Sequence, residues 1–312
     1  MARNIKFAIR IHQGGYDYSY IRDIFRKADV LGYHAASLYD LLNIPTLECW
    51  TTLSALAAET KSLKLIPMVL ANLYRHPSIT AKMAATLDVI SGGRMELGIG
   101  AGGGERDHQS YGFNYPSVRE RAAMLSESVQ IIEQLWTGDR SNFQGRFYKL
   151  TNAICQPPPV QQPKPPILIG GHGETHLMRV LASHGDISNM QSDLPVAEHR
   201  RKRTILERYC SAIGRDVNQI ECSHNARIFI SENSTSLNSV IENRAKLEGK
   251  SFSQFQLEIN NSIVGTPEDC IRQIQTYTDY GISYFFLLFP KPINIDSIQL
   301  FAEKVMPYFS EN

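Results

Sequence analysis

Short, mostly apolar stretches alternate along the whole chain with longer stretches in which apolar residues recur every three or four positions. The first pattern is typical of buried strands, and the second of helices with one buried face. Residues 5–11 and 20–32 form the first such pair. Further strands are predicted at 33–39, 63–70, 94–100, 166–170, 186–190, 220–230 and 283–289. Further helices are predicted at 46–60, 78–91, 119–136, 174–183, 196–214, 266–281 and 295–309, with helical material also between 230 and 260.

Eight strand–helix units with nearly continuous apolar strands indicate a parallel sheet that is covered on both faces. In a chain of 312 residues this pattern favours an α/β fold of the TIM-barrel type, (β/α)8, formed by residues 1–312 as a single domain. A doubly wound open sheet is the alternative. The alternation is interrupted at 137–165, and we interpret the proline run 156–166 as an extended excursion packed on the barrel rather than a linker between domains.

A glycine-rich stretch follows the fourth predicted strand, and Gly98, Gly100 and Gly103 satisfy the pattern G-x-G-x-x-G. A dinucleotide-binding fold requires a helix that opens directly from such glycines. The next helix signal here is a capping box formed by Ser117 and Glu120, well after the glycines. We therefore expect the glycines to belong to a long loop at the end of a strand.

Bulk composition narrows the possible partners. A formal net charge of +1 favours neither nucleic acid nor an anionic membrane as a partner. No apolar run reaches membrane-spanning length, and the N-terminus lacks the apolar core of a signal peptide. The five cysteines are scattered without metal-binding spacing, which favours reduced thiols in a cytoplasmic protein and supports no metal site.

In (β/α)8 barrels the active site lies at the C-terminal ends of the strands. The polar residues at or just after the ends of strands 1, 2, 3 and 6 are His12, Gln13, Asp40, Asn72, Tyr74, Arg75, His76, Asn189 and Gln191. Asp40 could point into the barrel mouth or serve as a turn or N-cap residue. His12 could likewise face the mouth or lie in a hydrated loop, and His108, in the glycine-rich loop, could be a hydrogen-bonded loop residue.

The stretch after the fifth strand has the composition of an anion site. Gly170, Gly171, His172 and Gly173 lead into a helix predicted to begin near Glu174. Free N–H groups at a helix start, with no side chains in the way, bind anions such as phosphate. The alternative is a tight turn between strand and helix with no ligand.

Four segments, taken in order, resemble the bacterial luciferase-like flavin or deazaflavin oxidoreductases. They are "SGGRMELGIGAGGGERDHQSYGF", "RERAAMLSESVQIIEQLWTGD", "FQGRFYKLTNAICQPPPVQQPKPPILIGGHGE" and "GTPEDCIRQIQTYTDYGISYFFL". The third segment is most similar to the branch that depends on coenzyme F420. The resemblance implies a TIM barrel with an insertion between strand 4 and strand 5.

The resemblance also implies a flavin-type ring in the barrel mouth, with its phosphate on the "GGHG" turn. It implies a non-proline cis peptide near Met68–Val69, with the residues from Val69 to Asn72 lining the ring. Asp40 matches an aspartate of the deazaflavin branch, and Asp40, His12 and Asn72 are the catalytic candidates. The expected cofactor-binding residues are Met68, Val69, Ala71, Gly100, Gly102, Gly103, His108, Gly170, Gly171, His172 and Gly173.

Two positions depart from the family pattern. The histidine that often follows the aspartate is Leu41 here, and Gly102–Gly103 stand where sugar-phosphate dehydrogenases of the family carry a glutamate. We expect an F420-dependent oxidoreductase that transfers a hydride between the deazaflavin and a small organic substrate. The alternatives are an FMN-dependent monooxygenase that uses reduced flavin and O₂, and a flavin-binding protein without turnover. A homodimer is also expected.

Overall fold

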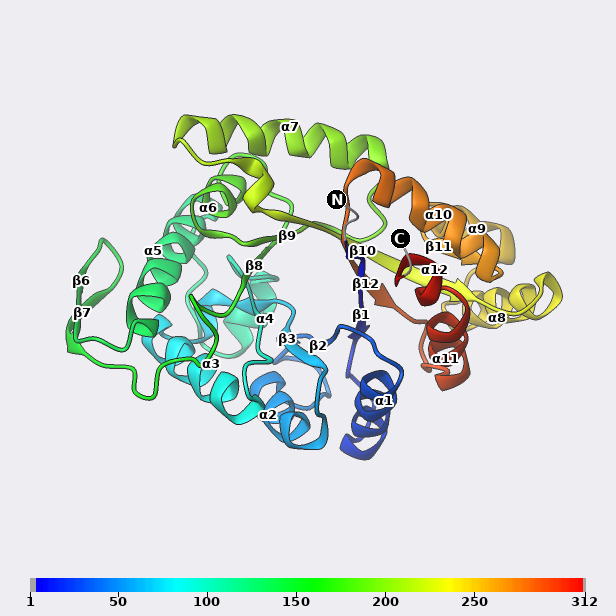
Figure 1. Cartoon of the computed structure of the whole chain (residues 1–312), viewed down its shortest axis with the longest axis horizontal. Helices are drawn as coiled ribbons and strands as arrows, with labels where there is room; N and C mark the ends of the chain where they lie inside the picture. The colour runs from blue at the N-terminus through cyan, green and yellow to red at the C-terminus, as the bar shows by residue number, and fades with distance from the viewer. Residues whose placement is uncertain (1–3, 311–312) are drawn as a thin grey trace.

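The computed structural model describes residues 4–310, and within them the strands form a closed parallel barrel surrounded by helices (Figure 1). The barrel strands are β1 (Lys6–Ile11), β2 (Ala35–Leu38), β3 (Lys64–Pro67), β4 (Leu70–Ala71), β5 (Leu97–Gly100), β8 (Ile167–Gly170), β9 (Ile187–Asn189), β10 (Glu221–Ile230) and β12 (Tyr284–Leu288). β1 pairs with β2 on one side and β12 on the other, and β4, the continuation of β3, pairs with β5. A parallel bridge between Leu65 and Met95 joins β3 to the residues before β5. The predicted barrel is confirmed, and the open sheet is wrong because neither end of the strand order is left unpaired.

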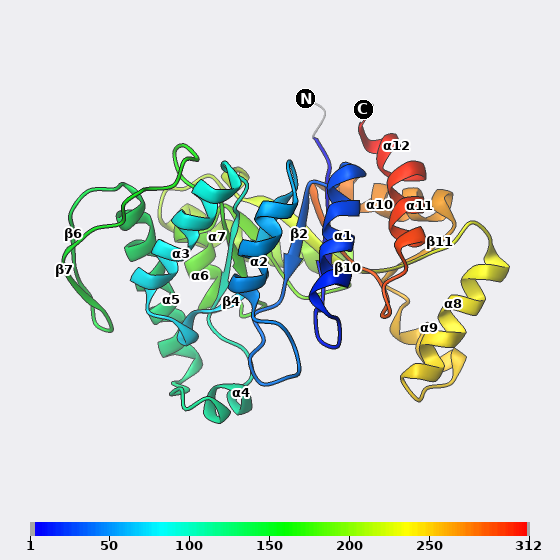
Figure 2. The ribbon, with the colours of Figure 1, turned by 90° about the horizontal axis from the view of Figure 1, so that it is seen from below.

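Each strand of the barrel is followed by helical structure that covers the outer surface. The long helices are α1 (Tyr18–Val30), α2 (Cys49–Glu59), α3 (Pro77–Ser91), α5 (Val118–Trp136), α6 (Leu177–His184), α7 (Val196–Ala212), α8 (Ser234–Leu247), α10 (Pro267–Tyr280) and α11 (Ile295–Lys304). The shorter ones are α4 (Glu105–Ser110), α9 (Phe252–Glu258) and α12 (Met306–Ser310). Inside the barrel, Ala8, Ile66, Leu168 and Phe286 belong to one buried cluster that fills the centre. Figure 2 shows α4, α8 and α9 on the side away from the chain termini, where the strands end.

The insertion between β5 and β8, which are the fourth and fifth strands of the sequence prediction, begins with an antiparallel hairpin. The hairpin is formed by β6 (Ser141–Gln144) and β7 (Lys149–Ala153), and the proline run follows it. The proline run packs on α3 through the buried carboxylate of Asp88. This carboxylate accepts hydrogen bonds from the backbone N–H of Val160 at 2.8 Å and from the side-chain amide of Gln161 at 2.6 Å. The predicted excursion is therefore held against the barrel, as expected.

Some local predictions need correction. The glycine-rich loop contains the short helix α4, which the sequence did not indicate. α6 begins at Leu177 rather than near Glu174, and the Glu174 carboxylate forms ion pairs with Arg201 and Lys202 on α7. The capping box of Ser117 and Glu120 is confirmed at the start of α5. A short strand that the sequence analysis missed, β11 (Ile263–Gly265), pairs with the end of β10.

A buried histidine pair lies between α7 and the barrel wall. The Nε2 atom of His199 is 3.0 Å from Nδ1 of His224, and the His224 ring stacks on Tyr277 with centroids 4.1 Å apart. Burial, with a smaller contribution from Lys202, lowers the pKa of His199 to about 4. Burial also lowers the pKa of His224 well below its ordinary value. Both rings are therefore neutral at pH 7.

This pair predicts a loss of stability in mild acid. A histidine whose pKa is lower in the folded state stabilises the fold fully above its unfolded pKa of about 6.5, and that contribution is lost as the pH falls towards the folded value. For His199 the loss between pH 6.5 and 4 is on the order of 3 kcal/mol, at about 1.4 kcal/mol per pH unit. Urea unfolding at pH 7.5, 6.0 and 5.0 measures it. The free energy of unfolding of the double variant His199→Gln/His224→Gln should depend less on pH than that of the parent. An equal dependence on pH in the variant and the parent would show that the histidine pair is not the cause.

Candidate active site

A cavity of about 360 Å³ opens at the C-terminal ends of the barrel strands, and we call it the mouth cavity. Its lining comprises Arg10, Tyr39, Asp40, Leu41, residues 68–71, Tyr74, residues 100–104, Asp107, residues 170–171, residues 189–192 and Asn225. Most of the residues that the sequence singled out for cofactor binding are therefore brought together here. A volume of this size and a lining from many loops are typical of small-molecule sites.

Gly100, Gly170 and the side chain of Val69 form one wall of the mouth cavity, which we call the glycine wall. A Cβ atom added at Gly100 would lie 2.9 Å from the carbonyl oxygen of Gly170, and one added at Gly170 would lie 2.6 Å from the side chain of Val69. The peptide bond between Met68 and Val69 is cis, as the resemblance implied. The glycines thus let three neighbouring strands approach closely and leave room for the Val69 side chain, so the wall is low and apolar and a flat ring can rest on it.

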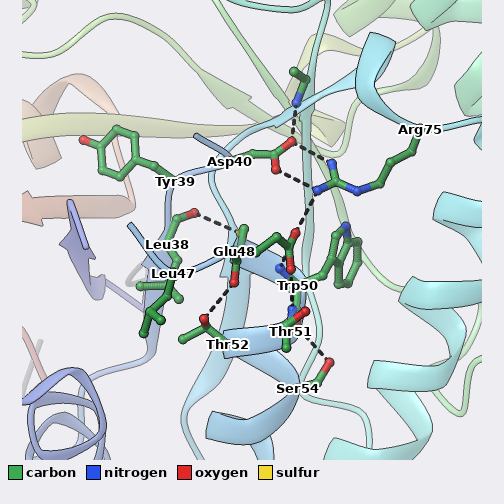
Figure 3. Close-up of polar contacts among 12 residues, drawn as sticks. Leu38, Tyr39, Asp40, Leu47, Glu48, Trp50, Thr51, Thr52, Ser54 and Arg75 are labelled. Atoms are coloured by element: carbon green, nitrogen blue, oxygen red, sulfur yellow. Dashed lines mark hydrogen bonds and ion pairs between the residues drawn. The ribbon is translucent and has the colours of Figure 1, made fainter. Parts of the chain in front are cut away.

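Asp40 borders the mouth cavity and is held in a network of hydrogen bonds with Arg75 and Glu48 (Figure 3). Its carboxylate accepts two hydrogen bonds from the guanidinium of Arg75, at 2.8 and 2.9 Å, and one from the backbone N–H of Ala71 at 3.0 Å. Arg75 also donates to Glu48 at 2.9 Å, and Glu48 caps α2 through the N–H of Thr51. Both oxygens of Asp40 are engaged by the scaffold, so its geometry is that of a residue that positions the segment after β4.

Another catalytic candidate, Asn72, follows β4 and has a different environment. It lies at the start of a short 3-10 helix (Asn72–Tyr74) and is buried. Within residues 4–310 its side-chain nitrogen has no hydrogen-bond partner. A buried amide without a partner is costly in a protein interior, but Asn72 is not among the residues that line the mouth cavity.

His108 supports the glycine-rich loop and is not part of the lining of the mouth cavity. Its ring packs against Tyr74 and Tyr115, with centroids 4.6 and 5.0 Å away, and its Nδ1 atom is 2.9 Å from the carbonyl oxygen of Gly104. Gly102 lies directly against this ring and has a positive φ of 100°. The structure therefore gives His108 the loop-anchoring role that the sequence analysis kept as its alternative.

Only half of the predicted phosphate-binding turn lines the mouth cavity. Gly170 and Gly171 line the mouth cavity, whereas His172 and Gly173 are exposed outside it. The N–H of Gly171 already donates to the carbonyl oxygen of Asn189 at 2.9 Å. A ligand anion at this turn would thus have to use the N–H groups that follow Gly171.

His12 points to a different place from the one expected. It lines a second cavity beside the mouth, and its ring centroid is 5.3 Å from that of Tyr39, which lines the mouth cavity. Burial, followed by the positive charge of Lys291, lowers the pKa of His12. The imidazole is therefore neutral at pH 7.

The sequence analysis missed Arg10, which lies on β1 and is 8% exposed. Its guanidinium donates to the hydroxyl groups of Tyr39 at 2.5 Å and Ser192 at 2.9 Å, while its Nε has no partner in the described part of the chain. None of its hydrogen bonds goes to a carboxylate. The signal was present in the sequence, because Arg10 is two positions from Ala8 and so faces the barrel interior.

The donor set fits a flat, electron-rich ring. The glycine wall offers a low apolar surface that carries only the side chain of Val69, and Arg10 offers a buried N–H group without a partner. Across residues 4–310, no three His, Cys, Asp or Glu side chains are grouped so that they could hold a metal ion. No helix in the same residues has the length and apolar character needed to cross a membrane.

Comparison with known proteins places this geometry in a family. The F420-dependent glucose-6-phosphate dehydrogenase of Amycolatopsis mediterranei is 32% identical over 168 residues, which are 54% of this chain and 47% of the relative. The pyrimidine monooxygenase RutA of Allorhizobium ampelinum is 34% identical over 158 residues, which are 50% of this chain and 41% of the relative. The matched regions thus span about half the length of these curated relatives.

The fold of the whole chain also has solved counterparts. The coenzyme F420 dependent tetrahydromethanopterin reductase of Methanopyrus kandleri superposes with a TM-score of 0.82 at 19% identity, covering 98% of this chain and 99% of the reductase. The sequence profile described as "Luciferase-like monooxygenase" matches residues 4–284. The chain therefore belongs to the luciferase-like monooxygenase family.

Proposed function

We propose that this protein is an F420-dependent oxidoreductase that transfers a hydride between the deazaflavin and a small organic substrate. The observation that carries the proposal is the mouth cavity itself, with its glycine wall and its buried Arg10 that has no carboxylate partner. The F420-dependent relative at 32% identity supports the choice of cofactor. When bound, the deazaflavin would supply the hydride chemistry, and the protein would supply position and electrostatics.

The residues of the mouth cavity would have separate tasks in this reaction. The guanidinium of Arg10 would donate hydrogen bonds to the acceptor edge of the ring and stabilise negative charge that develops there. Gly100 and Gly170, with the side chain of Val69, would support one face of the ring. Asn72 lies behind the lining of the cavity and would act only by supporting it. Asp40 would act indirectly, by fixing the N–H of Ala71 and the side chain of Arg75.

An FMN-dependent monooxygenase is the second candidate. The similarity to the pyrimidine monooxygenase favours it, and the same glycine wall accommodates either ring. The two candidates differ in what reacts with the reduced cofactor, which is an organic substrate that accepts a hydride in one case and O₂ in the other. A flavin-binding protein without turnover is the third reading.

Parallel titrations of the cofactor-free protein with coenzyme F420 and with FMN, each followed by the fluorescence of the ligand, test the proposal. We expect F420 to bind more tightly. Arg10→Gln should weaken F420 binding roughly 10- to 100-fold, because a hydrogen bond to a charged group contributes about 1.5–3 kcal/mol. Arg22→Gln is the matched control, since Arg22 lies outside the mouth cavity, is partly exposed and is paired with Asp23 on α1.

Other outcomes of the titrations have definite meanings. Tighter binding of FMN would replace the proposal by the monooxygenase and direct the work to oxygen uptake. Binding of neither cofactor would overturn both. Binding of F420 without oxidation or reduction of the bound ring by any of a panel of alcohols, aldehydes and activated alkenes would favour the binding protein.

A homodimer and a cytoplasmic location stay predictions that accompany this proposal. Ile79 and Ile90 on α3 are 54% and 56% exposed, and they offer an apolar surface for a second copy of the chain. Sedimentation equilibrium of the purified protein would determine the oligomeric state.

A further inference from the structure

A second cavity of about 280 Å³ lies beside the mouth cavity, at the ends of β10 and β12. Phe229, Phe255 and Phe289 line it, and all three are almost completely buried. The rings of Phe229 and Phe255 meet edge to face with centroids 5.7 Å apart. Phe255 belongs to α9, in the helical excursion after β10, so this excursion builds one side of the cavity. The aromatic side chains give the second cavity an apolar wall suited to an aromatic or aliphatic body.

Three basic residues line the same cavity, and two of them form ion pairs with carboxylates. Arg227 is paired with Asp193 at 2.7 Å, and Arg244 is paired with Glu248 at 2.7 Å. The ammonium group of Lys291 donates to the carbonyl oxygen of Gly14 and lies 4.9 Å from the centre of the Tyr16 ring.

Among residues 4–310, no carboxylate forms an ion pair with Lys291, so the second cavity carries one excess positive charge. An apolar wall next to an unbalanced cation selects a ligand that has both an apolar body and an acid group. A neutral ligand would leave the ammonium without a counter-charge, and a cation would be repelled.

The second cavity is adjacent to the mouth cavity through the barrel wall. Leu288 lines the second cavity and is the register partner of Arg10, which lines the mouth. His12 lines the second cavity and contacts Tyr39 of the mouth. A ligand held in the second cavity would thus lie next to the place where the proposed function puts the ring.

We propose that the second cavity binds the substrate and that the substrate is a compact organic anion with an apolar, aromatic-sized body and one acid group. The acid group would pair with Lys291, and the body would lie on Phe229, Phe255 and Phe289. The role as substrate rests on the proposed function, whereas the binding of such an anion does not. The volume of about 280 Å³ is at the small end of ligand pockets, which favours a single-ring body over a nucleotide or a long lipid.

The test compares 4-phenylbutyrate with its neutral amide, 4-phenylbutyramide, by calorimetric titration into the full-length protein without added cofactor. We expect the carboxylate to bind at least tenfold more tightly at pH 7.5 and low ionic strength. Lys291→Met should abolish this preference, and Lys291→Arg should retain most of it. Lys246→Met is the matched control, since Lys246 is an exposed α8 lysine paired with Glu242. Phe255→Leu should weaken both ligands by a similar factor.

Equal affinities for the acid and the amide would overturn the proposal, and so would an unchanged preference in Lys291→Met. If Lys291→Met fails to fold, as judged by circular dichroism, Lys291→Gln is titrated in its place with the same expected loss. Titration with F420 separates the two proposals. F420 binding without acid preference overturns only the assignment of the second cavity. Acid preference without F420 or FMN binding overturns the proposed function and leaves an anion-binding site.

Discussion

Replacing Asp40 by Asn is expected to lower the free energy of unfolding by about 3 kcal/mol and to abolish cofactor binding. The Asp40 side chain is completely buried, and its partner Arg75 is 15% exposed. Breaking a buried ion pair typically costs about 3–5 kcal/mol, because one charge is left without its partner. The lower end applies here, since Glu48 still pairs with Arg75 in the variant. Urea unfolding measures the loss.

Two further variants make the result specific. Asp23→Asn removes an exposed carboxylate that is paired with Arg22, and it should change stability by less than about 1 kcal/mol. The double variant Asp40→Asn/Arg75→Met removes both buried charges. Its loss of unfolding free energy should therefore be smaller than the sum of the losses in the two single variants. If the free energy of unfolding of Asp40→Asn lies within about 1 kcal/mol of the parent value, the assignment of Asp40 as a positioning residue is wrong. Asp40 would then again be a catalytic candidate. If the assignment holds, lost activity in an Asp40 variant is no sign of a catalytic carboxylate.

The substitution Gly98→Ala is expected to leave no soluble protein, or to destabilise it by about 3 kcal/mol or more. A Cβ atom at this position would lie 2.2 Å from the carbonyl oxygen of Pro67. That oxygen belongs to the neighbouring barrel strand, so relief requires backbone movement, and overpacking typically costs about 1–3 kcal/mol even where side chains can adjust. Soluble yield and urea unfolding report the effect.

Gly103→Ala is the matched control from the same stretch of sequence. Nothing lies within 4 Å of the added Cβ, and Gly103 is not among the glycines with positive φ. We expect its stability to be within about 0.5 kcal/mol of the parent. If Gly98→Ala and Gly103→Ala change the free energy of unfolding equally, close packing of the strands does not explain the glycine at position 98.

Much of the fold could be predicted because the apolar periodicity reports burial directly. Parallel strands that are buried on both faces appear as continuous apolar runs, and the capping box of Ser117 and Glu120 is a local signal that needs no tertiary context. The G-x-G-x-x-G pattern could be set aside for the same reason. No long helix opens from its glycines, and only the six-residue α4 follows them.

The rest depends on contacts between residues far apart in the chain. The ion pairs of Glu174 with Arg201 and Lys202 of α7, for example, join residues that are 27 and 28 positions apart. His12 and Asp40 both follow strands, yet only Asp40 borders the mouth cavity. The unpaired charge of Arg10 is visible only when the side chains around it are placed. Sequence patterns identify the end of the barrel that carries the site, whereas the partners of each polar group require the structure.

The excursion formed by α8 and α9 packs around its own small apolar cluster of Phe229, Ile241, Ala245, Phe255 and Ile259. This cluster is separate from the apolar residues that fill the barrel and from those that join the barrel to its helices. Substitutions in α8 and α9 can therefore alter one side of the second cavity with little effect on the barrel that holds the ring. Such a division lets ligand preference diverge among descendants while the shared scaffold is inherited unchanged, and it marks α8 and α9 as the segment to randomise in directed evolution.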